Sequence, residues 1–337
     1  PPPLSQAPPP TAIYSLYSSS AASDVYKRQV LQRIFSALLV TLAVTVVVFL
    51  LIHLIPGDPV DVMLGESATV ADRQAMRTSL GLDKPLIVQL SEYLTGIVQF
   101  DFGQSLHSKQ AISSLLAERI PATVQLTLAA LLAALTISLP VGILAAVYKG
   151  KLIDRLSMLL AMTGLSIPNF LLGPLLVLFF SLWLGWLPVS GNEGPWHLVL
   201  PALTLGLSMA AILARMVRSS LLETLGEDFV RTAWAKGVHP ADIIWKHAMR
   251  NAWLPVITII GAQLGALLGG AVVTETVFDW PGLGTLMIDS IQKRDYPVVQ
   301  ACVLVISVTY VVVNSLTDIL YSFLDPRIGI RGVRKLS

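Results

Sequence analysis

Long apolar runs separated by short polar segments dominate the pattern along this chain. A membrane-spanning helix needs about 20 mostly apolar residues, and six runs reach that length. Several contain proline, as at Pro140, Pro168 and Pro201, which a helix inside a bundle tolerates as a kink because neighbouring helices satisfy the freed carbonyl group. The pattern predicts an all-α polytopic membrane protein with six transmembrane helices. They are expected at 34–55, 121–147, 156–183, 198–216, 254–278 and 299–323.

Composition supports the membrane assignment. The 337 residues have a mean hydropathy of +0.70 and only 13% are charged, which excludes a soluble domain of this length. The net charge is +2, and no basic stripe interleaved with aromatic residues is present, so the expected partner is a lipid bilayer and not nucleic acid. The single cysteine, Cys302, lies in an apolar run, so no intrachain disulfide is possible.

The distribution of Lys and Arg predicts the direction of the spans. If the N-terminus is cytoplasmic, the inside segments carry sixteen basic residues and the outside segments carry seven. Five of those seven lie in the long loop 56–120, and long loops count less in the positive-inside rule. Both termini are therefore expected in the cytoplasm.

The spans divide the chain into four parts. Residues 1–29 are rich in Pro, Ser and Tyr and lack an apolar signal region, so they are expected to be a disordered or artefactual leader. The first span and a long periplasmic loop occupy 30–117, where "KPLIVQLSEYLTGIVQF" predicts amphipathic helices on which an external domain could dock. The other five spans form a core over 118–323, and 324–337 is a cytoplasmic tail.

One charged stretch, "RTAWAKGVHPADIIWKHAMRNAWLP" (231–255), is kept out of the membrane. With the residues before it, this stretch predicts two short helices: the first, "SSLLETLGEDFVRTAWAK" (219–236), ends at Gly237, and the second opens at Pro240. The second helix has charged residues four apart and the apolar Ile243 and Ile244 beside them. A solvated loop is the commoner structure for such a segment, but exposed apolar positions favour a partner surface. The charged positions are Asp242, Lys246 and Arg250.

Motifs for chemistry are missing. The chain has no phosphate-binding G-x-x-x-x-G-K-[ST], no zinc-binding His spacing and no G-x-S-x-G elbow, so it is expected to be neither an enzyme nor a cofactor-binding protein. Ionisable residues within spans are functional candidates by default. His53, Glu275 and Asp318 lie near span ends, where a structural role is the commoner one. The lack of a deeper carboxylate lowers the case for an ion-coupled secondary transporter.

Small residues recur in the fifth predicted span. Gly261, Gly265 and Gly269 are spaced by four and predict a flat stripe for close helix packing. The packing partner is either another helix of this chain or a second subunit, and spacing alone does not choose between them.

Nine motifs in order resemble one family. From about Val30 to Arg331 the chain resembles an inner-membrane permease subunit of a bacterial ABC importer of the dipeptide, oligopeptide, glutathione and nickel group. A single tetrapeptide such as PGDP is weak, but the order and spacing over some 300 residues are specific. The motifs are "HLIPGDPV" (53–60), "DFGQSL" (101–106), "PVGILAAVYKG" (140–150), "LPALTLG" (200–206), "RMVRSSLLETLGEDFVRTAWAKGV" (215–238), "HAMRNAWLPVIT" (247–258), "TETVFDWPGLG" (274–284), "RDYPVVQ" (294–300) and "DPRI" (325–328).

The resemblance implies a type I ABC importer permease fold, with a cytoplasmic coupling loop at 217–253 that docks on an ATPase through the EAA motif. Arg231, Thr232 and Ala233 occupy the E-A-A positions, Gly237 is the motif glycine, and Leu254–Pro255 is the closing pair. The motif glutamate is replaced by Arg231, which puts in doubt any salt bridge ascribed to it. The implied ATPase-coupling residues are Arg231, Thr232, Ala233, Gly237, Pro240, His247, Arg250, Asn251, Leu254 and Pro255.

The resemblance also implies partners and a mechanism. Two ATP-binding subunits would hold ATP and Mg, a second homologous permease would complete the path, and a periplasmic or lipid-anchored solute-binding protein would deliver the substrate. Alternating access in the bacterial cytoplasmic (inner) membrane would then import short peptides, either di- and oligopeptides or glutathione. Nickel or another small solute is the alternative substrate. An ion-coupled secondary transporter or a membrane scaffold are alternatives from other classes.

Overall fold

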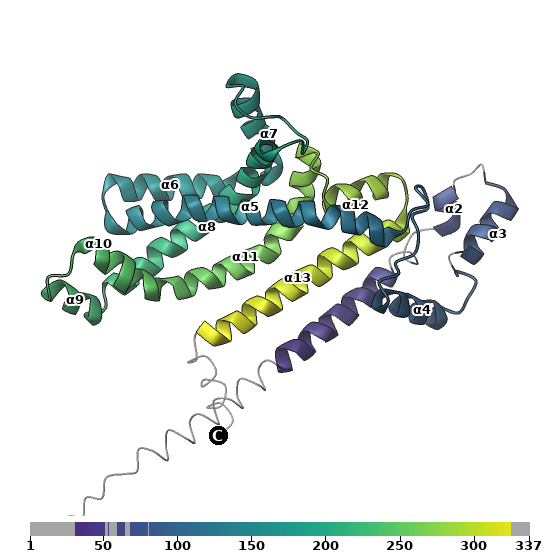
Figure 1. Ribbon diagram of the computed structural model, residues 1–337, viewed down its shortest axis with the longest axis horizontal. Helices are drawn as coiled ribbons and strands as arrows, with labels where there is room; N and C mark the ends of the chain where they lie inside the picture. Colours follow the sequence, from purple (N-terminus) through teal and green to yellow (C-terminus); the bar gives the residue numbers. More distant parts are fainter. Residues whose placement is uncertain (1–30, 51–52, 54–58, 65–67, 80, 325–337) are drawn as a thin grey trace, which may run out of the picture.

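The computed structural model describes residues 31–50, 53, 59–64, 68–79 and 81–324, and these are almost entirely helical (Figure 1). The predicted leader 1–29 and nearly all of the predicted tail lie outside the described residues. The N-terminal half contains a helix at Leu31–Leu50, α2 (Pro59–Leu64), α3 (Val70–Ser79), α4 (Leu86–Val98), α5 (Ile112–Val147), α6 (Leu152–Ser166), α7 (Asn169–Leu176) and the π-helix η1 (Val177–Trp183). The remainder contains η2 (Pro195–Leu198), α8 (Val199–Leu225), α9 (Asp228–Ala235), α10 (Pro240–Asp242), the π-helix η3 (Ile243–Ala248), α11 (Met249–Phe278), α12 (Leu283–Gln292) and α13 (Tyr296–Leu324).

The apolar helices confirm the predicted fold class. Within the described part of the chain, four helices are long and apolar enough to cross a membrane, and two further pairs qualify if each bent pair is one span. Each of the six predicted runs coincides with one of these helices or pairs. The direction in which they cross stays a prediction.

The prolines within the predicted spans have different effects. Pro140 lies inside α5, which continues unbroken for 36 residues. Pro168 instead ends α6, and α7 with η1 then departs at 108°, so the prediction of one kinked helix over 156–183 was wrong. The residue before a proline is disfavoured in the helical region, and Ile167 is extended at φ −91° and ψ 117°. Pro201 lies in the first turn of α8, where no helical hydrogen bond is lost.

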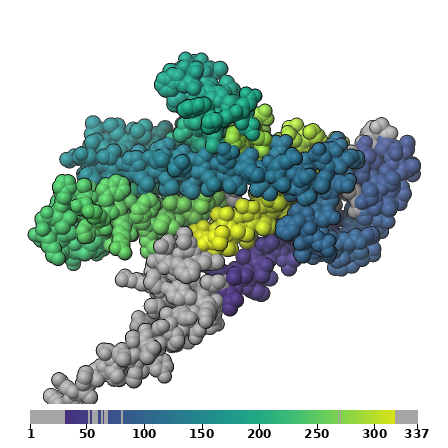
Figure 2. All heavy atoms as spheres, in the orientation of Figure 1, coloured from purple at the N-terminus to yellow at the C-terminus, as the bar shows by residue number. Residues whose placement is uncertain are grey.

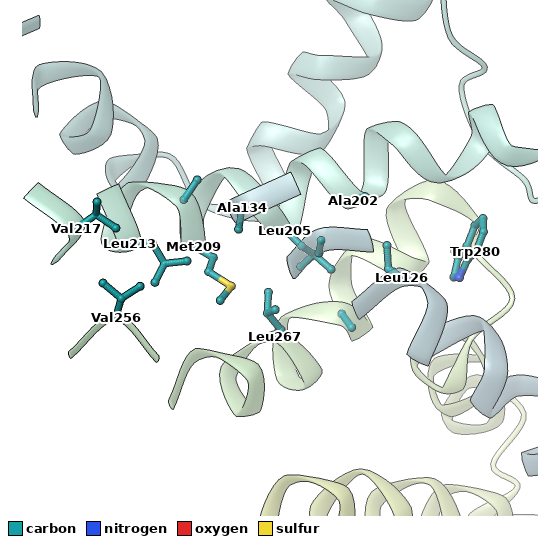
Figure 3. Packing of buried hydrophobic residues seen from close by; sticks show 13 residues of the cluster. Leu126, Ala134, Ala202, Leu205, Met209, Leu213, Val217, Val256, Leu267 and Trp280 are labelled. Carbon is teal, nitrogen blue, oxygen red and sulfur yellow. The ribbon is translucent and has the colours of Figure 1, made fainter. Parts of the chain in front are cut away.

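Helices α5 and α8 pack closely at two glycines. A Cβ atom at Gly206 would lie 2.7 Å from the carbonyl oxygen of Ala130, and one at Gly142 would lie 2.7 Å from that of Ala214. Small residues at these crossings let the two backbones approach, as is typical of membrane helices. The largest core cluster extends along this contact and onto α11 (Figure 3). Its larger members include Leu126, Leu205, Met209, Leu213, Val217, Val256, Leu267 and Trp280.

The bundle has two distinct ends (Figure 1). Helices α9 and α10 lie at one end, called here the α9 end, and α12 lies toward the other, called here the α12 end, which also carries α2, α3 and α4. The segment formed by α7 and η1 projects from one side of the bundle, as the space-filling view also shows (Figure 2). The predicted amphipathic segment of the long loop is the helix α4.

Candidate functional site

The charged stretch forms a compact unit at the α9 end, called here the α9–η3 segment (residues 226–248). The sequence predicted one helix from residue 219 to the Gly237 turn, and that prediction was wrong. Helix α8 continues to Leu225, the chain breaks at Gly226 and Glu227, and α9 then covers Asp228–Ala235. Glycine has low helix propensity, and Glu227 is extended at φ −74° and ψ 151°, which redirects the chain.

A tight turn at Gly237 ends α9. Its φ is +74°, in the left-handed region that glycine adopts without steric cost. The Gly237 amide donates a hydrogen bond to the Trp234 carbonyl oxygen at 3.0 Å, and the Val238 amide donates one to Ala233 at 3.2 Å. Pro240 then starts α10 as expected, with the Nδ1 atom of His239 accepting a hydrogen bond from the Ala241 amide at 3.3 Å.

The second helix of the segment is continuous with a membrane-spanning helix. Helix α10 continues through η3 into α11, so the helical run from Pro240 reaches Phe278. Two short helices were predicted here, and in the structure the second of them is continuous with a span. Leu254 and Pro255 consequently lie within α11, half-buried, instead of closing a loop.

The apolar side of the α9–η3 segment is buried within the chain. Ile243 packs with Val230 and Ala233 and is fully buried, while Ile244 contacts a neighbouring cluster on α8 and α11. The prediction that Ile243 and Ile244 are exposed and seek a partner was therefore wrong. Ile243 holds α9 against η3 and gives the segment a core of its own, whereas Ile244 packs the segment onto α8 and α11.

The opposite side of the segment is exposed and carries aromatic residues that the sequence reasoning missed. Phe229, Trp234 and Trp245 are 41%, 51% and 60% exposed. The helical spacing could have identified them, because it places them on other faces than Val230, Ala233 and Ile243, which are buried. Exposed aromatic residues are typical of protein contacts. Of the predicted coupling residues, Ala233 is buried, and Arg231, Thr232, Gly237, Pro240, His247, Arg250 and Asn251 are exposed.

Two exposed ion pairs lie along this surface. Arg231, at the position of the motif glutamate, approaches Asp228 at 3.3 Å, and Lys246 approaches Asp242 at 2.8 Å. The hydrogen bond from Lys246 holds the pKa of the Asp242 carboxyl below its usual range. Exposed pairs of this kind contribute little to stability, so their charges stay accessible to a partner.

The glycine stripe of α11 lies partly against α13. A Cβ atom at Gly261 would collide with Thr317, and one at Gly265 would lie 2.7 Å from Tyr310. A Cβ atom at Gly269 would meet nothing within 4 Å. Gly261 and Gly265 thus allow a close contact between two helices of this chain, and Gly269 does not take part in it.

A buried carboxylate, called here the Glu275 anchor, joins three helices at the α12 end. Glu275 of α11 is fully buried, and its Oε1 accepts a hydrogen bond from the Thr123 hydroxyl of α5 at 2.6 Å. Its Oε2 accepts one from the Gly284 amide of α12 at 2.6 Å. The Thr123 hydroxyl oxygen also accepts from the Leu283 amide at 2.8 Å. Glu275 therefore satisfies the free amides at the start of α12, which is the structural role that its place near a span end indicated.

Two of the sequence motifs meet just before the start of α13. Ser105 of "DFGQSL" donates a hydrogen bond to Asp295 of "RDYPVVQ" at 2.6 Å, and both residues are buried. A cleft of about 840 Å³ lies beside this contact. Its walls are the loop around Ser105, α3, α4 and the ends of the N-terminal helix and α13. His53, the ionisable residue of the first span, lines it, with Nε2 3.1 Å from the Gln89 Oε1.

Comparison with known proteins identifies the family. The profile described as "Binding-protein-dependent transport system inner membrane component" matches residues 138–330, and that of its N-terminal region matches residues 26–127. The chain is 45% identical over 299 residues to the glutathione transport system permease protein GsiC of Salmonella paratyphi A, covering 89% of this chain and 98% of that protein. The protein of the same name from Escherichia coli K12 is 43% identical over the same shares.

Solved structures show the same fold at low sequence identity. The methionine ABC transporter MetNI, in an inward-facing conformation, contains a chain that is 21% identical with a TM-score of 0.54, covering 63% of this chain and 96% of that one. A chain of an amino acid ABC transporter is 15% identical with a TM-score of 0.50, covering 62% and 94%. This multi-pass protein of the inner membrane belongs to the family of binding-protein-dependent transport system inner membrane components, the permease subunits of ABC importers.

Proposed function

We propose that the importer of this chain carries glutathione or short peptides. The observation that supports this proposal is the 45% sequence identity to a glutathione transport permease, over 98% of the length of that protein. The similarity runs through both the N-terminal region and the core, so it includes the helices that form the path as well as the α9–η3 segment.

The α9–η3 segment is the coupling element in this proposal. Its own core, Val230, Ala233 and Ile243, makes it a rigid unit, and both of its ends continue into spans. A force applied to its exposed face is therefore passed to α8 and α11. The contact residues are the exposed members of the coupling set, Arg231, Thr232, Gly237, Pro240, His247, Arg250 and Asn251, with Phe229, Trp234 and Trp245 added by the structure.

The proposed complex has four kinds of subunit. Two ATPase subunits dock on coupling segments and hold ATP and Mg, so this chain needs no cofactor and catalyses no hydrolysis. A second homologous permease supplies the other half of the path. A periplasmic or lipid-anchored solute-binding protein delivers the substrate at the α12 end.

The test is transport by the reconstituted complex. The tagged chain is purified with its co-expressed ATPase, permease and binding proteins and placed in liposomes, and uptake of labelled glutathione, labelled dipeptide and labelled nickel is compared with and without ATP. ATP-dependent uptake of glutathione or the peptide, abolished when the binding protein is left out, is the expected result. ATP-dependent uptake of nickel alone would overturn the substrate assignment, and uptake without any ATPase would overturn the coupling.

A further inference from the structure

A partly buried ion pair joins α6 to α8 near the α9 end. Arg218 of α8 donates hydrogen bonds from Nε to Oδ1 of Asp154 at 2.6 Å and from Nη2 to Oδ2 at 2.8 Å. The Gly150 amide, in the turn between α5 and α6, donates to the same Oδ2 at 2.8 Å. Asp154 is 4% exposed, so the carboxylate has exchanged water for these three donors.

A second polar contact joins α7 to α8 farther along. The Ser208 hydroxyl of α8 donates a hydrogen bond to Oδ1 of Asn169 at 2.6 Å, directly after the bend at Pro168. Helix α6 is thus fixed to α8 near its start, and α7 is fixed to α8 at the bend. Between these contacts many side chains of α6 are exposed and apolar, including Leu156, Leu159 and Leu160.

The position of Arg218 connects this pair to the α9–η3 segment. Arg218 lies seven residues before the end of α8, which is roughly two helical turns. Helix α9 begins after two intervening residues. Helix α6, by contrast, is separated from the segment in sequence by the whole of α7, η1, η2 and α8. Any movement of the segment reaches α8 through the chain itself and reaches α6 through noncovalent contacts.

We propose that Asp154 and Arg218 are positioning residues that make α6 and α8 move as one body when the α9–η3 segment moves. This rests on the proposed coupling role of that segment. A two-pronged guanidinium–carboxylate contact fixes both distance and orientation, which apolar packing alone does not. A buried pair gives little net stability compared with apolar residues, so its value lies in the geometry it imposes. Asp154 and Arg218 are called the α6–α8 clamp below.

The experiment uses the reconstituted importer and measures ATP hydrolysed per substrate imported. Asp154→Asn with Arg218→Met removes both charges together, which avoids leaving one of them buried alone. The adjacent Arg155→Met is the matched control: it removes an exposed positive charge that also acts on Asp154, and it leaves the hydrogen bonds of the clamp in place. We expect the double variant to assemble with its ATPase but to use roughly two- to thirtyfold more ATP per substrate, the range of measured coupling effects. The Arg155→Met ratio should match the parent.

A second readout separates positioning from a general loss of fold. Spin labels on the exposed Leu156 of α6 and Arg215 of α8 report the distance between these helices, which should stay constant through the ATP cycle in the parent and change with ATP in the double variant. A parental ATP ratio, or a constant label distance in the double variant, would overturn the clamp. Failure of the coupling proposal is recognised separately, because substitution of the exposed face of the α9–η3 segment, Trp234→Ala with Trp245→Ala, would then leave ATP-dependent import at the parental level.

Discussion

Positions 237 and 282 both require glycine, but for different physical reasons. Gly237 has φ +74° and open space around it, so its backbone conformation is what excludes other residues. Gly282 has φ −102°, which any residue adopts, but a Cβ atom there would collide with the Glu275 carboxylate. The first glycine shapes a surface turn, and the second allows the anchor at the α12 end.

Substitution at Gly237 should uncouple the importer. A β-branched residue in the left-handed region costs on the order of 1–3 kcal/mol, so Gly237→Val is expected to open the turn between α9 and α10. ATP-driven import should fall while the protein stays inserted. Gly185→Val is the matched control, since Gly185 also has positive φ (+62°) and nothing within 4 Å but lies far from the α9–η3 segment in sequence. Equal import by the two variants, measured in liposomes, would contradict the role of the turn.

Substitution of Glu275 should destabilise the α12 end. Glu275→Gln replaces one acceptor with an amide donor, which then faces a hydroxyl or a backbone amide that also donates. An unsatisfied buried polar group costs about 1–3 kcal/mol, so the thermal midpoint in detergent should fall. Thr276→Val is the neighbouring control, because Thr276 is exposed and bonds only its own helix at Val272. A midpoint for Glu275→Gln equal to that of the control would show that the anchor is dispensable.

Single residues were predicted from sequence where local rules decide the outcome. Gly237 and Pro240 follow from turn and helix-start chemistry, and the turn is observed. Arg218 was counted only as a basic residue of an inside segment and Asp154 was not singled out, because the pairing of residues 64 positions apart depends on how α6 and α8 pack. Ile243 was misassigned for the same reason, since the fold of α9 back onto η3 buries it.

At the scale of elements, α11 and α13 test whether small residues set a helix contact. Gly261→Ala inserts a methyl group against Thr317, and overpacking of this kind costs about 1–3 kcal/mol. Gly269→Ala meets open space and should be neutral or stabilising by up to about 1 kcal/mol, the helix propensity difference. Thermal midpoints of the two variants in one detergent give the comparison. A lower midpoint for Gly269→Ala than for Gly261→Ala would mean that the stripe contacts a different surface.

The elements themselves follow from the apolar pattern, but their breaks do not. Six predicted runs became four helices and two bent pairs. Pro140 and Pro168 look alike in sequence, yet α5 is continuous and α6 ends in a 108° bend. The difference lies in the surroundings: the α5 backbone is packed along α8, whereas at Pro168 the chain turns outward and Asn169 is held by Ser208. Such tertiary contacts are absent from local sequence.

For the whole molecule, the two ends are built differently. The α12 end is fixed by Glu275 and by the Ser105–Asp295 contact. The α9 end presents a compact segment with exposed aromatic side chains and short ion pairs. This asymmetry suits an importer in which force enters at one end and substrate at the other.

The exposed tryptophans of the α9 end provide the sharpest test of assembly. Trp234→Ala with Trp245→Ala removes two large side chains that are 51% and 60% exposed, so the free chain should fold normally. Aromatic residues buried at an interface centre contribute about 2 kcal/mol or more each, so loss of even one such contact should weaken binding of the ATPase by at least roughly thirtyfold. Titration of fluorescent ATPase onto the tagged chain in detergent measures this.

A matched pair of tryptophans makes that experiment decisive. Trp183→Ala with Trp186→Ala removes residues that are 72% and 70% exposed but follow α7, away from the α9–η3 segment. This control should bind the ATPase like the parent. Equal weakening in both double variants would indicate a general loss of structure, and parental binding by the Trp234/Trp245 variant would place the ATPase on another surface. Selective loss would assign the force-receiving face of the permease to the side of α9 and η3 that its own core leaves uncovered.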